Sequence, residues 1–160
     1  MGKRHKRPVA EFQPSLVKRP ILGAAPRVTK VPAIAADPST NHLYPSWRIG
    51  RLLLVGPFGW HELEAAKLLE IRAKLANFES MTWNDIIVGA KKRNHTISVD
   101  QLCKDAQHQL ASLNLYDIDE VVSLHLTGTE RVWGYREGAV LHVLWWDPDH
   151  QIRPSLPKHT

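Results

Sequence analysis

The sequence predicts one α+β domain over residues 46–160, preceded by a disordered, basic, proline-rich tail over residues 1–45. Helical periodicity between residues 61 and 113, and alternation of apolar and polar residues in the C-terminal third, support the domain. Prolines recur every six residues from Pro8 to Pro38, which opposes regular structure in the tail. We therefore expect a short N-terminal strand, two to three helices on one face of a sheet, and a three-stranded antiparallel meander.

The tail is predicted to be disordered because its composition opposes a packed core. Residues 1–56 contain ten Lys/Arg and two acidic residues, a net charge of +8, whereas residues 57–160 have a net charge of −3. The prolines favour extended backbone, and few large apolar residues lie between them. Two roles remain open for the tail: an electrostatic arm for RNA, a ribosome or DNA, and a solubilising extension.

Ordered structure is expected to begin near Trp47. Residues 49–55 form a branched and aliphatic run closed by Gly56-Pro57, which predicts a short strand ended by a turn. Residues 61–78 then predict a helix, because apolar residues recur at spacings of three and four while charged residues occupy the other side. The apolar stripe comprises Leu68, Ile71, Leu75 and Phe78.

Two further helix starts carry capping signals. Thr82, with Asp85 three residues later, predicts a short helix that continues through Val88. Ser98 and Gln101 have the spacing of a capping box and predict a third helix. Its apolar stripe, which places the single cysteine in the core, comprises Val99, Leu102, Cys103, Ala106, Leu110 and Leu113.

The strands of the meander are separated by turn signals at residues 127–129 and at Glu137-Gly138. If the second turn is a two-residue hairpin loop, Trp133 lies opposite His142. The face expected to contact the helices carries Leu124, Leu126, Val132, Gly134, Leu141, Val143 and Trp145. The other face, expected to be exposed, carries Ser123, His125, Arg131, Trp133, Tyr135, His142, Leu144 and Trp146.

The exposed face is where we expect chemistry. Cleavage of an RNA phosphodiester needs a base for the 2′-hydroxyl, a cation for developing negative charge, an acid for the leaving oxygen and a stacking surface. His125, Arg131 and His142 suit the first three roles, and Trp133 suits the fourth. The alternative is a second hydrophobic layer, in which this face packs against residues 49–55 or a partner and the histidines are simply hydrogen-bonded.

The run Asp147-Pro148-Asp149-His150 follows the last strand. Two carboxylates beside a histidine could bind a metal ion, with His142 as a further ligand, and support a metal-dependent hydrolase. The same run is an ordinary turn, in which proline presets the backbone angle and aspartate bonds the local backbone. The turn is the preferred interpretation, and no metal is expected.

Several classes of protein are excluded by what the sequence lacks. It has no phosphate-binding loop, dinucleotide fingerprint, His-Glu-x-x-His or Gly-x-Ser-x-Gly motif, so we expect no nucleotide cofactor and no other cofactor. The longest apolar run, residues 52–55, is too short to cross a bilayer, and no secretory signal follows the basic N-terminus. A single cysteine fits a reducing cytoplasm.

The sequence LHLTGTERVWGYREG over residues 124–138, followed by LHVLWWD over residues 141–147, resembles the C-terminal meander of RelE-type toxins. Those proteins share the order of strand, helices and three strands, and they end in a short basic or histidine-bearing segment. Here that segment would contain His150, Arg153, Lys158 and His159. The end of the chain, WWDPDH followed by KHT, is also similar to uncharacterised bacterial proteins.

This resemblance implies a small, cytoplasmic, ribosome-dependent endonuclease that cleaves mRNA by metal-independent acid/base chemistry and pairs with an antitoxin protein. The predicted catalytic residues are His125, Arg131, His142 and His150. The predicted RNA-binding residues are Trp133, Tyr135, Arg136, Arg153 and Lys158. The alternative function is a non-catalytic RNA- or protein-binding module of a phage or mobile element.

Overall fold

The computed structural model describes residues 40–89 and 93–154. Most of the predicted tail, residues 1–39, lies outside the described residues. Contacts with the domain already begin at Thr40, whose Oγ1 donates a hydrogen bond to Gly138 O at 3.3 Å. The carbonyl of Leu43 accepts a hydrogen bond from Trp83 N at 3.0 Å. The folded unit therefore includes residues before the predicted boundary at residue 46.

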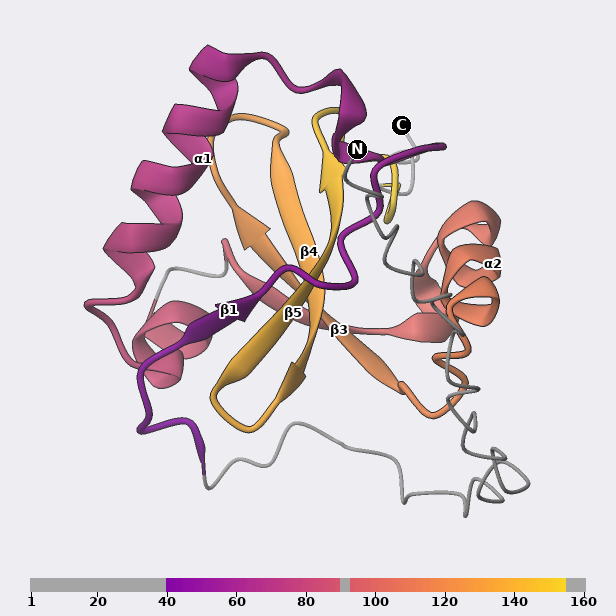
Figure 1. The fold of residues 1–160 in the computed structure, drawn as a ribbon. Helices are drawn as coiled ribbons and strands as arrows, with labels where there is room; N and C mark the ends of the chain where they lie inside the picture. The colour runs from indigo at the N-terminus through magenta and orange to yellow at the C-terminus, as the bar shows by residue number, and fades with distance from the viewer. Residues whose placement is uncertain (1–39, 90–92, 155–160) are drawn as a thin grey trace, which may run out of the picture.

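The fold is α+β, with a mixed five-stranded sheet of order β1-β5-β4-β3-β2 (Figure 1). The strands are β1 (Ser46–Arg48), β2 (His95–Ser98), β3 (Glu120–His125), β4 (Arg131–Glu137) and β5 (Val140–Asp147). The longer helices are α1 (Ala65–Phe78) and α2 (Lys104–Ser112), and single helical turns span Trp60–Glu62, Asp85–Gly89 and Val99–Gln101. None of the helices among the described residues has the length and apolar character needed to cross a membrane.

The predicted antiparallel meander forms the centre of the sheet as β3, β4 and β5. Two edge strands extend it: β2 pairs antiparallel with β3, and β1 pairs parallel with β5. The strand predicted over residues 49–55 is wrong, because β1 lies just before that run. Within the run, Leu52 N donates a hydrogen bond to Ile49 O at 3.1 Å, which closes a turn where a strand was expected.

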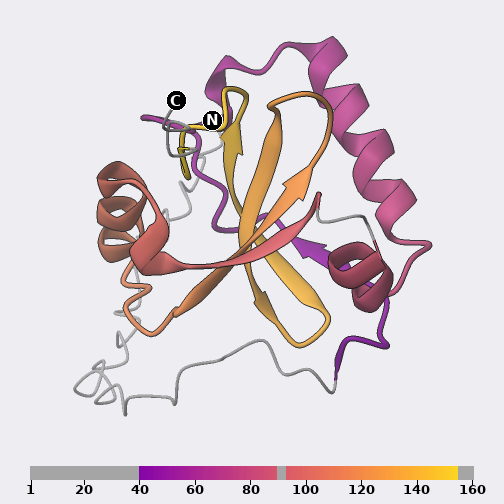
Figure 2. The same ribbon diagram turned by 180° about the vertical axis from the view of Figure 1, so that it is seen from behind.

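Helices cover both faces of the sheet, so the prediction of helices on one face is wrong. Figure 1 shows α1 and α2 on opposite sides of the strands, and Figure 2 shows the same arrangement from behind. Neighbouring strand residues alternate between the two cores. Val132 packs in the core that contains Ile71 of α1, and Trp133 packs in the core that contains Leu110 of α2. Both faces are apolar because the central strands are buried on both sides.

The hairpin loop and a bulge between β4 and β5 both change the predicted register. The predicted loop Glu137-Gly138 is wrong, because Glu137 pairs with Val140 and the loop is Gly138-Ala139. Trp133 lies opposite Trp145, but Gly134 lies opposite Val143, so Leu144 is an extra residue in β5. A Cβ atom at position 134 would lie 2.3 Å from the carbonyl oxygen of His142, which explains the glycine at the bulge. The bulge places Trp145 on the α2 side, opposite to the prediction.

The two capping predictions have different outcomes. Thr82 and Asp85 do form reciprocal bonds: Thr82 N donates to Asp85 Oδ2 at 3.0 Å, and Asp85 N donates to Thr82 Oγ1 at 3.2 Å. They start only the single turn at Asp85–Gly89. Ser98 instead ends β2, and α2 begins later without a side-chain cap. The capping box at Ser98 is therefore wrong, because its residues belong to a strand and a 3₁₀ turn.

Candidate functional site

The residues best suited to chemistry gather in a groove of about 570 Å³ beside the edge strand β2. We call it the histidine groove. It is lined by His95, Ile97, Gln101, Ser123, His150, Arg153 and Pro154. Two imidazoles, a hydroxyl and a guanidinium thus share one concave surface, which is the arrangement expected of a binding or catalytic site.

The sheet register fixes the strand side of the histidine groove. His95 in β2 lies directly opposite Ser123 in β3. Ile97, two residues after His95, is buried in the core that contains α2, and alternate strand residues point to the same face. The burial of Ile97 therefore holds His95 on the α2 side of the sheet, beyond the area that α2 covers.

A buried aspartate shapes the other side of the histidine groove. Asp147 is only 1% exposed, and its two carboxylate oxygens accept hydrogen bonds from Gln151 N at 2.8 Å and Ile152 N at 3.0 Å. Ile152 is itself fully buried, and its carbonyl accepts a hydrogen bond from Cys103 N. This turn places His150 at the groove. Asp147 therefore has the role of a turn residue, as the preferred sequence interpretation held.

The metal-ion alternative is not supported by the geometry of its four residues. Among residues 40–89 and 93–154, no three His, Cys, Asp or Glu side chains lie together in a way that could hold a metal ion. His142 lies near the other end of β4, where its Nε2 is 2.9 Å from Glu137 Oε2. Both oxygens of Asp147 are already occupied by backbone donors.

Arg131 lies opposite Asp147 at the start of β4. Its Nη1 donates hydrogen bonds to the carbonyls of Gly128 at 3.1 Å and Glu130 at 2.9 Å, which hold the guanidinium over the β3–β4 turn. Because both bonds come from one nitrogen, the other nitrogens of the planar guanidinium can donate hydrogen bonds to an anion. The position of Arg131 thus depends on the geometry of this turn.

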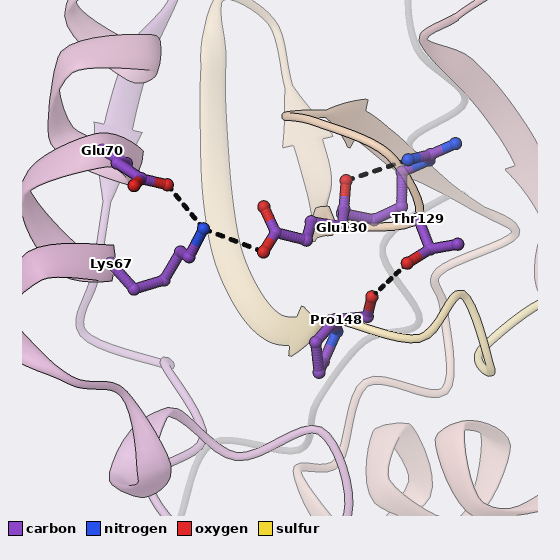
Figure 3. Close-up of polar contacts among 6 residues, drawn as sticks. Lys67, Glu70, Thr129, Glu130 and Pro148 are labelled. Atoms are coloured by element: carbon purple, nitrogen blue, oxygen red, sulfur yellow. Dashed lines mark hydrogen bonds and ion pairs between the residues drawn. The ribbon is translucent and has the colours of Figure 1, made fainter.

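The β3–β4 turn is tied down on two sides, as Figure 3 shows. Lys67 on α1 pairs with Glu130, with Nζ and Oε1 2.9 Å apart, and it also pairs with Glu70. On the opposite side, Thr129 Oγ1 donates a hydrogen bond to the carbonyl of Pro148 at 2.6 Å. Contacts to α1 and to the C-terminal turn therefore fix the backbone that carries Arg131.

The histidine groove favours neutral imidazoles. Burial lowers the pKa of His95, and the charges of Arg153 and Arg131 lower it further. Burial also lowers the pKa of His150, as do Arg131 and Arg153, while Asp147 opposes them. A neutral imidazole is a proton acceptor, so at neutral pH each histidine is ready to act as a base beside two cations.

The other predicted catalytic residues lie elsewhere. His125 ends β3 and lines a separate pocket on the α1 side. Burial is the main cause that lowers the pKa of His125, and the charge of Arg131 lowers it further. His142 stacks on Tyr135 with ring centroids 4.4 Å apart. The structure thus brings together Arg131 and His150 of the predicted catalytic set, but it does not bring His142 to them.

Three predicted RNA-binding residues are buried, which corrects the expectation of an exposed face. Trp133 is 0% exposed and Tyr135 is also buried, because α2 and its core cover this face. Arg136 is 6% exposed and lies over the ring of Trp83 at 4.6 Å. The face that carries Trp133 is therefore a second hydrophobic layer, but α2 supplies most of its cover instead of residues 49–55 or a partner. Arg153 lies at the histidine groove, and Lys158 is outside the described residues.

His95 is the site residue that the sequence interpretation missed. It lies in the run His95-Thr96-Ile97, whose two β-branched residues are of the kind that favours a strand. The capping pattern at Ser98 concealed this signal, because it assigned the following residues to a helix. A strand assignment would have placed His95 and Ile97 on one face.

No protein-family model matches the sequence, and neither a curated protein nor a solved structure matches it. The case for function therefore rests on the geometry of the chain itself. Two features of the structure bear on function: the histidine groove, which is lined by Arg153 and lies near Arg131, and the backbone conformation of His150. His150 has a φ of 57°. It belongs to the turn that Asp147 stabilises, and it lines the groove.

Proposed function

We propose that the protein is an endoribonuclease that cleaves phosphodiester bonds in the histidine groove. One of His95 and His150 takes the proton from the 2′-hydroxyl, whose oxygen then attacks the adjacent phosphorus. The other histidine gives a proton to the leaving 5′-oxygen. The products are a 2′,3′-cyclic phosphate and a 5′-hydroxyl, so atoms and charge balance without any further reactant.

The arginines supply the electrostatic part of this proposal. Arg131 offers a fixed fork of donors, and Arg153 offers a second cation at the mouth of the groove. Negative charge increases on the phosphate oxygens in the transition state, and positioned donors stabilise it more than they stabilise the substrate. A bound phosphate also offsets the charge of the arginines, which favours protonation of the histidine that acts as the acid.

The observation that carries the proposal is the grouping of two histidines and Arg153 around one groove, with Arg131 close enough to help lower the pKa values of both histidines. The conformation of His150 supports it. A φ of 57° is costly for a side chain with a Cβ, and glycine or asparagine is the usual residue there. Strained backbone at a groove residue supports a chemical role for that residue.

The narrower proposal is an mRNA endonuclease of the RelE type. It rests on the resemblance of residues 124–147, and it names the ribosome and an antitoxin protein as partners. A protein of this kind should arrest the growth of a bacterial host when it is expressed alone, and a His150→Ala variant should not. The alternative, a non-catalytic binding module, predicts that both proteins are tolerated.

The cleavage proposal is tested with purified protein and a labelled single-stranded RNA. His95→Ala and His150→Ala should each lower the cleavage rate by roughly 100- to 10,000-fold, the usual contribution of a general acid or base. His108→Ala is the matched control, because this exposed histidine on α2 lies away from the groove and should cut at the parental rate. Equal rates for all four proteins would overturn the assignment, and parental affinity without cleavage would favour the binding module.

A further inference from the structure

A second pocket lies on the other face of the sheet from the histidine groove. It has a volume of about 430 Å³, and we call it the Lys74 pocket. It is lined by Lys74, Asn77, Phe78, Met81, Gly89, Arg93, Asn94 and His125. Within the described part of the chain, none of these lining residues is acidic.

The Lys74 pocket combines an apolar surface with cations. Phe78 is largely buried and presents its ring beside Lys74, whose Nζ lies 5.4 Å from the ring centroid. Met81 adds further apolar surface, and Arg93 supplies a second positive charge. A nucleotide has the same two parts, since its base stacks on apolar or aromatic surface and its phosphate pairs with Lys or Arg.

The two pockets share a wall made of consecutive residues. Arg93 and Asn94 line the Lys74 pocket, and the next residue, His95, lines the histidine groove. On the neighbouring strand β3, Ser123 lines the histidine groove, and His125 at the end of the strand lines the Lys74 pocket. A chain of nucleotides that leaves one pocket over this edge of the sheet therefore enters the other directly.

Asn94 keeps this shared wall in place. Its side chain is buried, and its amide nitrogen donates a hydrogen bond to Ile86 O at 2.9 Å. Its amide oxygen accepts a hydrogen bond from His125 N at 2.8 Å. These bonds connect the end of β3 to the segment just before β2, so the two pockets have a fixed relation to each other.

We propose that the Lys74 pocket is a second nucleotide subsite, and that the substrate is single-stranded RNA that crosses the edge formed by β2 and β3. Lys74 and Arg93 bind a phosphate there, and Phe78 and Met81 contact an unpaired base. This inference rests on the proposed function, because it extends the substrate of the histidine groove. A base-paired strand cannot present its base to such a surface, which selects single strands.

The test measures binding separately from cleavage. A labelled hexanucleotide with 2′-O-methyl groups cannot react, so its affinity reports binding alone. Lys74→Gln combined with Arg93→Gln should weaken this affinity by about 10-fold or more. It should also flatten the dependence of log affinity on log salt concentration by roughly 1.4, the value for two lost phosphate contacts with a single strand.

The matched control is Arg72→Gln, which removes one positive charge from an exposed position on the same helix. It should leave both affinity and salt dependence close to parental values. A dinucleotide with 2′-O-methyl groups should lose less affinity than the hexanucleotide does when Lys74 and Arg93 are replaced. A base-paired hairpin RNA should bind more weakly than the single strand, and equal binding would overturn the selection of single strands.

The outcomes separate this inference from the proposed function. Unchanged hexanucleotide affinity and salt dependence in the double variant would overturn the second subsite, even if His150→Ala abolished cleavage. Lost affinity in the double variant, with no cleavage by the parent protein, would support the subsite and overturn the endonuclease. Thermal melting of each variant near the parental temperature shows that the fold is retained.

Discussion

The two ends of β4 use the same kinds of side chain in different ways. At the C-terminal end, Arg136 donates hydrogen bonds to Gly138 O at 2.6 Å and to Asn41 and Thr40, each at 2.7 Å. The nearby His142 is buried against Glu137 and Tyr135. At the N-terminal end, by contrast, His150 lines an open groove, and Arg131 lies close enough to help lower its pKa.

The difference shows how residue type alone fails to identify a site. Arg131 bonds two backbone carbonyls through a single nitrogen, whereas three nitrogens of Arg136 are bound within the fold. His150 lines the groove, whereas His142 is only 7% exposed. A polar group whose donors are satisfied inside the fold stabilises that fold, and one that faces a groove remains available to a ligand.

The largest expected effect is on cleavage. Arg131→Ala should lower the cleavage rate by roughly 100- to 1,000-fold, because loss of one positioned donor to a developing oxyanion has this size. The melting temperature should change little, since the guanidinium bonds only the local turn. Arg131→Lys, which keeps the charge but loses the fork, should recover only part of the rate. A parental rate for Arg131→Ala would remove this arginine from the chemistry.

The next largest expected effect is on stability, and it comes from replacing Arg136 at the C-terminal end of β4. Arg136→Ala should lower the free energy of unfolding by about 2–3 kcal/mol, because it deletes several charge-assisted hydrogen bonds and the contact with the ring of Trp83. Denaturant unfolding measures this loss. The cleavage rate of the folded protein should stay parental. A loss of cleavage with unchanged stability would mean that Arg136, like Arg131, takes part in the chemistry.

The meander was predictable because alternation and turn signals are local properties of the sequence. Leu124, Val132 and Leu141 were placed on one face, and the structure buries them together in the core that contains α1. The turn at Asp147 was predictable for the same reason, since aspartate followed by proline favours a local backbone bond. Features that depend on a few neighbouring residues could thus be predicted from the sequence.

The site was only partly predictable because its position depends on long-range pairing. The hairpin loop at Gly138-Ala139 and the bulge at Gly134 together shift the register of β5, so Trp133 lies opposite Trp145 rather than His142. Pairing of β2 with β3 brings in His95 from a segment assigned to no strand. A one-residue change in register moves side chains to the opposite face, and no local pattern specifies it beyond an isolated glycine.

A smaller effect is expected of pH on stability, and it comes from the histidines near the N-terminal end of β4. The folded state lowers the pKa values of His95, His125 and His150, so it resists protonation more than the unfolded chain does. Stability from these groups is complete above pH about 6.5, the ordinary histidine value, and is lost as the pH falls below it. Denaturant midpoints measured from pH 8 to pH 5 should decrease on the acid side.

A variant with both His95→Gln and His150→Gln should lose part of this pH dependence. The two substitutions remove groups that bind protons in the unfolded state but not in the folded state between the two pKa values. Above pH about 6.5 these histidines are neutral in both the folded and the unfolded state, so their titration adds no difference in stability between parent and variant. As the pH falls from the unfolded pKa to the folded pKa, the parent should lose more stability than the variant, and below both pKa values the two slopes should be equal. An identical slope in both proteins would mean that other groups cause the acid sensitivity.

The smallest expected change in stability concerns His150 and separates its backbone role from its chemistry. Its φ of 57° is strained for any residue with a Cβ atom, and glycine adopts it freely. His150→Gly should therefore be about 1 kcal/mol more stable than His150→Ala, because only alanine keeps the strain. Both variants lack the imidazole, so both should lose cleavage to the same extent. If His150→Gly were more stable and still cut RNA at the parental rate, His150 would be a turn residue like Asp147, and both ends of β4 would be structural.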